Sequence, residues 1–124
     1  MKEIQNLLKK LEKLDSKNMY NNDFLLTWDK SSEELQAVFT VAEILRSMRE
    51  NNISPRIFDS GLAISVFRDN STRTRFSFNS ASNLLGLTVQ DLDEGKSQIA
   101  HGETVRETSN MISFMADGRY ESFD

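Results

Sequence analysis

The feature that most constrains the fold is a short apolar run, residues 61–67, that leads directly into a polar segment and then into a helical pattern. A nearly continuous run of this length is typical of a strand covered on both faces in a parallel sheet. After the polar residues 68–75, apolar side chains recur at helical spacing, and Gly86 provides a helix stop. The pattern predicts a strand-to-helix junction within residues 67–75.

The same alternation continues along the chain. Residues 87–92 are a second strand candidate, and residues 103–115 carry another amphipathic helical pattern. The order strand, helix, strand, helix favours an α/β domain with a short parallel sheet and a right-handed crossover.

Two helical segments are predicted before the first strand. Apolar residues from Ile4 to Leu14 recur three and four positions apart, which predicts an amphipathic helix that ends near Asp15. Ser31 and Glu34 have the spacing of a capping box and open a predicted helix over residues 32–50. Its expected apolar face carries Leu35, Val38, Ala42, Leu45 and Met48.

Aromatic and long apolar side chains mark the expected core. We assign Phe76, Phe78, Phe114 and Met115 to it rather than to a cofactor site, and expect Trp28 to pack against the same layer. The apolar patch of residues 24–28 is interpreted as an anchor rather than a long strand.

Composition excludes several classes of protein. The 124 residues include no cysteine, which excludes a disulfide scaffold, a thiolate metal site and a cysteine nucleophile. The 15 Lys and Arg against 19 Asp and Glu argue against a general nucleic-acid or anionic-membrane surface. No apolar run approaches the roughly 20 residues of a membrane helix, and no secretory signal opens the chain. A cytoplasmic protein is expected.

The predicted junction concentrates groups that bind anions. Open parallel sheets bind ligands beyond the carboxyl ends of their strands, where a helix N-terminus offers unpaired amides. Ser71, Thr72 and Thr74 add hydroxyl groups there, and Arg73 and Arg75 add guanidinium groups suited to phosphate. The spacing of a Walker loop or a dinucleotide fingerprint is absent.

Two other interpretations compete with a phosphate site. Ser71 and Thr72 could be an ordinary helix cap with the arginines in surface ion pairs, and residues 73–77 could be a kinase substrate in a loop. The apolar residues on both sides disfavour the second. For Arg75, the ligand is either the phosphate or a buried carboxylate, and we favour the structural role.

The segment from Phe67 to Phe78 resembles the S-T-R-T-R carbamoyl-phosphate motif of the aspartate and ornithine carbamoyltransferases. Residues 24–31 resemble the entry to that family's first helices, and residues 93–104 resemble the loop before its next helix. The resemblance covers about residues 20–117 and is nearest to the knotted carbamoyltransferase branch. It implies an incomplete three-layer αβα domain with a short parallel sheet, flanked by N-terminal helices.

The resemblance also implies roles for single residues. Ser71, Thr72, Arg73 and Thr74 would bind the phosphate of carbamoyl phosphate, with Arg73 and Thr74 as catalytic residues. Arg73 would stabilise the leaving group, and Thr74 would lie near the carbamoyl oxygen. No metal or organic cofactor is implied, and we assign no metal site to Asp91, Asp93 and Glu94, which we interpret as acids on a loop.

A second implied element is a loop that reaches into the site of a neighbouring subunit in a homotrimer. Its candidate residues are Lys96, Ser97, Gln98 and His101. Histidine stands where the family pattern has lysine, and a solvent-exposed role for His101 is the alternative.

The implied reaction is transfer of a carbamoyl group from carbamoyl phosphate to the amine of an amino acid. We expect residues 1–117 to form a partial carbamoyl-phosphate-binding domain, with residues 1–22 as an N-terminal helix and linker and residues 118–124 as a divergent tail. The second-substrate domain would then be missing, and the chain alone would be inactive. The alternatives are a non-catalytic phosphate-binding or oligomerisation module and an inactive gene fragment.

Overall fold

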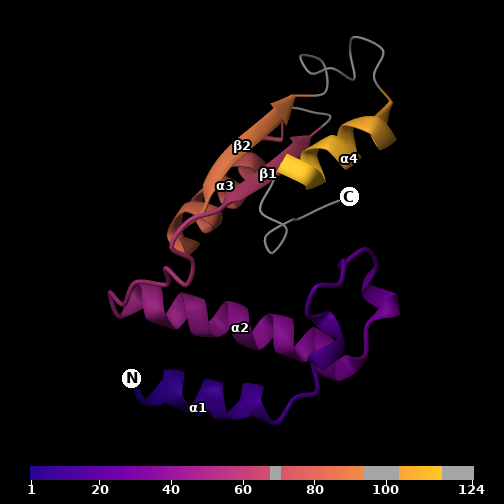
Figure 1. Ribbon diagram of the computed structural model, residues 1–124. Helices are drawn as coiled ribbons and strands as arrows, with labels where there is room; N and C mark the ends of the chain where they lie inside the picture. The colour runs from indigo at the N-terminus through magenta and orange to yellow at the C-terminus, as the bar shows by residue number, and fades with distance from the viewer. Residues whose placement is uncertain (68–70, 94–103, 116–124) are drawn as a thin grey trace. The chain divides into compact units, whose positions relative to one another are not determined.

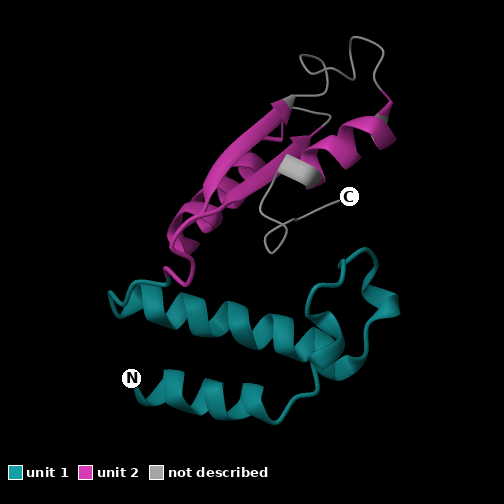
Figure 2. Ribbon diagram, in the orientation of Figure 1, with its two compact units in different colours: residues 1–55 teal, residues 56–124 magenta. Residues whose placement is uncertain are grey.

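The computed structural model describes residues 1–67, 71–93 and 104–115 (Figure 1). The chain divides into two compact units, residues 1–55 and 56–124 (Figure 2). In the described part no helix is long and apolar enough to cross a membrane. The predicted boundaries at residues 22 and 117 stay predictions.

The first unit is a pair of packed helices, α1 (Lys2–Glu12) and α2 (Ser32–Glu50). Two short 3-10 turns, η1 (Lys17–Met19) and η2 (Thr27–Asp29), lie between them. The predicted capping box begins α2: Glu34 donates its backbone N–H to Ser31 Oγ at 3.1 Å, and Ser31 N–H reaches Glu34 Oε1 at 2.7 Å. The extent of α2 is therefore confirmed, while α1 ends three residues before Asp15.

The predicted apolar face of α2 is only partly right: Leu35, Leu45 and Met48 are half-buried, whereas Ala42 is exposed. The residues that become buried are Ala37, Thr40, Ile44 and Ser47, whereas Val38 is 40% exposed. The two buried hydroxyl groups have partners within the unit: Thr40 donates to Gln36 O, and Ser47 donates to Glu3 Oε2 on α1. Burial on α2 therefore includes hydroxyl side chains that an apolar periodicity does not count.

The expected anchor at residues 24–28 is also not buried. Trp28 is 77% exposed and Leu25 is 72% exposed, so neither contributes to a core within its own unit. Periodicity shows that side chains are apolar, but it does not show whether a partner covers them.

The second unit contains the predicted sheet. Strands β1 (Leu62–Phe67) and β2 (Thr88–Asp93) pair in parallel, and helix α3 (Thr72–Leu85) connects them and packs against both (Figure 1). Ala63, Ile64 and Ser65 are consecutive and all buried, so both faces of β1 are covered at this point, as predicted. The α/β class with a short parallel sheet is confirmed.

Helix α3 ends where the glycine signal predicted. Gly86 has φ of +103°, Leu87 N–H bonds to Ser82 O, and Gly86 N–H bonds to Asn83 O, which together close the last turn. A further helix, α4 (Val105–Met115), begins with a second capping box between Thr104 and Glu107.

The predicted core position of Phe76 is wrong, because its side chain is 71% exposed, whereas Phe78 is half-buried. The side chains of Phe114 and Met115 lie outside the described part.

Candidate functional site

The candidate site is the first turn of α3, which follows β1 in the chain. Ser71 is the N-cap residue, and Thr72, Arg73 and Thr74 occupy the first three helical positions. Ser71 is half-buried and the other three are exposed to solvent. The structure therefore places all four predicted phosphate ligands in one helical turn.

The Ser71 side chain does not cap its own helix. Its hydroxyl donates instead to Thr74 Oγ1 at 2.9 Å, and no side-chain cap is present on α3 within the described residues. The first helical hydrogen bond runs from Arg75 N–H to Ser71 O at 3.1 Å, which leaves the amides of the preceding residues directed toward the N-terminal end. This differs from α2 and α4, where Glu34 and Glu107 close the first turn.

The charges of this turn favour an anion. The first turn of α3 contains no acidic residue, and Thr74 stands at the position that a glutamate takes in the two capping boxes. Within the described part of the chain, the Arg73 guanidinium makes no ion pair or side-chain hydrogen bond. Helix amides, hydroxyl groups and this guanidinium together can bind a phosphate or a carboxylate.

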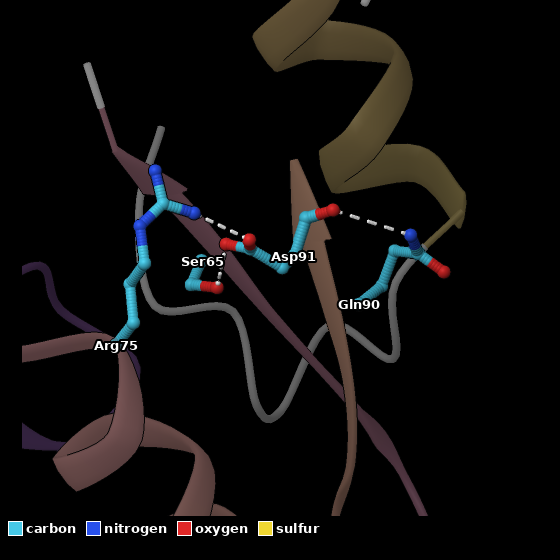
Figure 3. A network of polar contacts seen from close by, with 4 residues as sticks. All are labelled: Ser65, Arg75, Gln90 and Asp91. Carbon is cyan, nitrogen blue, oxygen red and sulfur yellow. Dashed lines mark hydrogen bonds and ion pairs between the residues drawn. The ribbon is translucent and has the colours of Figure 1, made fainter. Parts of the chain in front are cut away.

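Arg75 takes the structural role that we favoured for it. Its Nη1 lies 2.5 Å from Asp91 Oδ2, and its guanidinium carbon lies 5.0 Å from the centre of the Phe67 ring. Asp91 also accepts a hydrogen bond from Ser65 Oγ at 2.8 Å (Figure 3). The arginine thus joins α3 to both strands.

The sequence interpretation missed this contribution of Asp91 and Ser65. Asp91 belongs to the strand predicted over residues 87–92, although it is also grouped above with Asp93 and Glu94 as a loop acid; it lies within β2, opposite Ser65 in the parallel register. A serine inside an apolar strand is a signal that could have revealed the pair, because a buried hydroxyl needs a partner. In the described residues no group of three or more His, Asp or Glu side chains could hold a metal ion.

The neighbouring-subunit loop cannot be compared with the structure. Lys96, Ser97, Gln98 and His101 all lie outside the described residues. Their roles stay predictions.

Comparison with known proteins decides the family. The family described as aspartate/ornithine carbamoyltransferase, carbamoyl-P binding domain, matches residues 22–120. The chain belongs to the aspartate/ornithine carbamoyltransferase family. The matched region is that family's carbamoyl-phosphate-binding domain and includes the α3 turn described above.

Two curated carbamoyltransferases align with most of the chain. The Escherichia coli (strain K12) protein named "Putative carbamoyltransferase YgeW" is 62% identical over 117 residues, which are 94% of this chain and 29% of that protein. The catabolic ornithine carbamoyltransferase of Treponema denticola is 30% identical over 118 residues, 94% of this chain and 35% of that enzyme. This chain thus spans about a third of the length of these relatives.

A solved structure supports the fold. Aspartate transcarbamoylase from Trypanosoma cruzi, in complex with carbamoyl aspartate and phosphate, has a TM-score of 0.72 over 81% of this chain and 32% of its own. The sequence identity is 20%, so the likeness concerns the fold.

Proposed function

We propose that the chain binds carbamoyl phosphate at the first turn of α3 and supplies this half of the site of a carbamoyltransferase. The observation that carries the proposal is the acid-free first turn, which has no side-chain cap among the described residues, with the Ser71 hydroxyl bonded to that of Thr74 and Arg73 exposed beside them. Membership of the carbamoyltransferase family supplies the ligand class.

In the proposed complex, the phosphate oxygens accept hydrogen bonds from the α3 amides and from the hydroxyl groups of Ser71, Thr72 and Thr74. Arg73 adds charge-assisted hydrogen bonds, which are stronger than those between neutral groups. The helix dipole acts in the same direction, because its N-terminal end is positive. The backbone amides of the turn are already directed toward the N-terminal end, so they need no reorganisation during the reaction.

The proposed reaction transfers the carbamoyl group of carbamoyl phosphate to the amine of an amino acid. The amine nitrogen forms a bond to the carbamoyl carbon, a tetrahedral intermediate forms, and the bond to the phosphate oxygen then breaks. Phosphate leaves with the electron pair of the broken C–O bond and takes up the proton that the amine loses. Arg73 stabilises the charge that develops on the leaving phosphate, and Thr74 lies near the carbamoyl oxygen.

Replacement of Arg73 tests the phosphate site. We expect Arg73→Ala to weaken binding of carbamoyl phosphate and inorganic phosphate by about 1.5–3 kcal/mol, the contribution of hydrogen bonds that involve a charged group. Isothermal calorimetry measures both affinities. Arg46→Ala is the matched control, since it removes the same charge from an exposed position on α2. Equal affinities of wild type and Arg73→Ala would overturn the assignment of Arg73.

We further propose that the functional assembly is a homotrimer in which Lys96, Ser97, Gln98 and His101 complete the site of a neighbouring subunit. Mixing experiments test this arrangement. Arg73→Ala chains and Lys96→Ala chains are each expected to be defective alone. When the two are dissociated and reassembled in equal amounts, about one quarter of the native sites should return. The reason is that about one pairing in four joins a subunit with an intact Arg73 to a neighbour with an intact Lys96. Titration with carbamoyl phosphate counts these sites. No recovery in an assembled mixture would contradict a shared site.

A further inference from the structure

The guanidinium of Arg75 is held on two sides. The centre of the Phe67 ring lies 5.0 Å from the guanidinium carbon. On the other side, the Asp91 carboxylate pairs with Nη1 at 2.5 Å. The Arg75 side chain is 23% exposed, so solvent screens the pair only in part. This environment combines a cation–π contact with a charge-assisted hydrogen bond.

Asp91 is itself held in place from the neighbouring strand. Ser65 Oγ donates to Oδ1 at 2.8 Å, while Oδ2 faces Arg75, so both carboxylate oxygens are engaged (Figure 3). Ser65 is 4% exposed and stands opposite Asp91 in the register of the sheet. Ser65 and Phe67 lie two residues apart on β1, so their side chains share the sheet face that α3 covers.

These contacts bear on the first turn of α3 because Arg75 follows Thr74 directly. The Arg75 backbone N–H makes the first helical hydrogen bond, to Ser71 O. Arg73 and Arg75 are two residues apart, which is about 200° around a helix. Anchoring Arg75 against the sheet therefore directs Arg73 toward solvent, where its side chain is exposed.

We infer that Asp91, supported by Ser65, is a positioning residue for the phosphate site. It holds Arg75 against the sheet, which orients the Ser71–Thr74 turn and keeps the second guanidinium away from the ligand. This inference rests on the proposed function. The inference predicts that loss of the Asp91 carboxylate weakens phosphate binding. Charge alone predicts the opposite, because removing a carboxylate near a cationic site strengthens the binding of an anion.

The test is calorimetric titration of inorganic phosphate into wild type, Asp91→Asn and Asp59→Asn. Asp59→Asn is the matched control, since it removes the same charge from an exposed position in the same unit. We expect Asp91→Asn to bind phosphate about tenfold more weakly, the size of one lost charge-assisted hydrogen bond, and the control to bind as wild type does. Unchanged or tighter binding by Asp91→Asn would overturn the inference.

Two further measurements keep the outcome clear. Ser65→Ala, like Asp91→Asn, should bind phosphate more weakly than wild type. Ser65→Thr retains the hydroxyl group and should bind phosphate as wild type does. Weaker binding by both Ser65 variants would contradict an action through the hydrogen bond. In ¹⁵N NMR spectra, the Arg75 Nε–H resonance should shift in Asp91→Asn and stay unchanged in Asp59→Asn. A wild type that binds no phosphate would overturn the proposed function and this inference, whereas normal wild-type binding with an unaffected Asp91→Asn would overturn the inference alone.

Discussion

Thr74→Glu is expected to abolish phosphate binding while it leaves the fold intact or makes it more stable. The substitution introduces at α3 the spacing that already exists between Ser31 and Glu34 and between Thr104 and Glu107. The new carboxylate would accept the Ser71 N–H, as Glu34 accepts the Ser31 N–H at 2.7 Å. A completed capping box and an acid near the helix N-terminus together stabilise a helix by about 0.5–1 kcal/mol.

The same carboxylate would occupy the anion site. Two unit charges about 4 Å apart repel by about 4 kcal/mol near a protein surface, which corresponds to roughly a thousandfold loss of affinity. The hydrogen bond from Ser71 Oγ to Thr74 Oγ1 is lost as well. Calorimetry would show the loss of phosphate affinity. Thermal unfolding, monitored by circular dichroism, would show unchanged or increased stability.

Two control variants separate the causes. Thr74→Gln can form the neutral version of the capping box, so it should lose less affinity than Thr74→Glu. Ser80→Glu adds the same charge at an exposed position later in α3 and should bind phosphate nearly as wild type does. Wild-type affinity in Thr74→Glu would show that the anion does not bind at this turn.

Gly86→Ala is expected to destabilise the second unit by about 3–5 kcal/mol, from left-handed strain, a steric clash and a disrupted hydrogen bond. A Cβ at Gly86 would lie 2.0 Å from the carbonyl oxygen of Phe58, and the backbone has φ of +103°. Phe58 cannot simply move away, because its N–H donates to Leu85 O at 3.0 Å at the end of the same helix. The loss is large beside a typical stability of about 5–15 kcal/mol.

Urea denaturation of wild type, Gly86→Ala and Gly86→Asn measures this effect. Asparagine tolerates a positive φ better than alanine but carries the same Cβ, so Gly86→Asn should remain strongly destabilised. Ser80→Ala, at an exposed position of the same helix, is the control and should change the free energy of unfolding little. Near wild-type stability of Gly86→Asn would show that the contact with Phe58 is not the cause.

Local features were predictable because their determinants lie within a few residues of one another. The capping box of Ser31 and Glu34, the end of α3 at Gly86 and the strand at residues 62–67 each depend on short-range hydrogen bonds or on an uninterrupted apolar run. The S-T-R-T-R motif likewise lies in one helical turn. Sequence alone therefore indicated the fold class, the family and the four candidate phosphate ligands.

Tertiary structure decided which side chains have partners. Ser65 and Asp91 are 26 residues apart, and only the register of the parallel strands places them opposite each other, with Arg75 from α3 against the same carboxylate. Similarly, α2 buries Thr40 and Ser47 and leaves Val38 exposed, although the sequence pattern placed Val38 on the apolar face. Periodicity describes the faces of a single element, but burial and ion pairing depend on which second element approaches it and how closely.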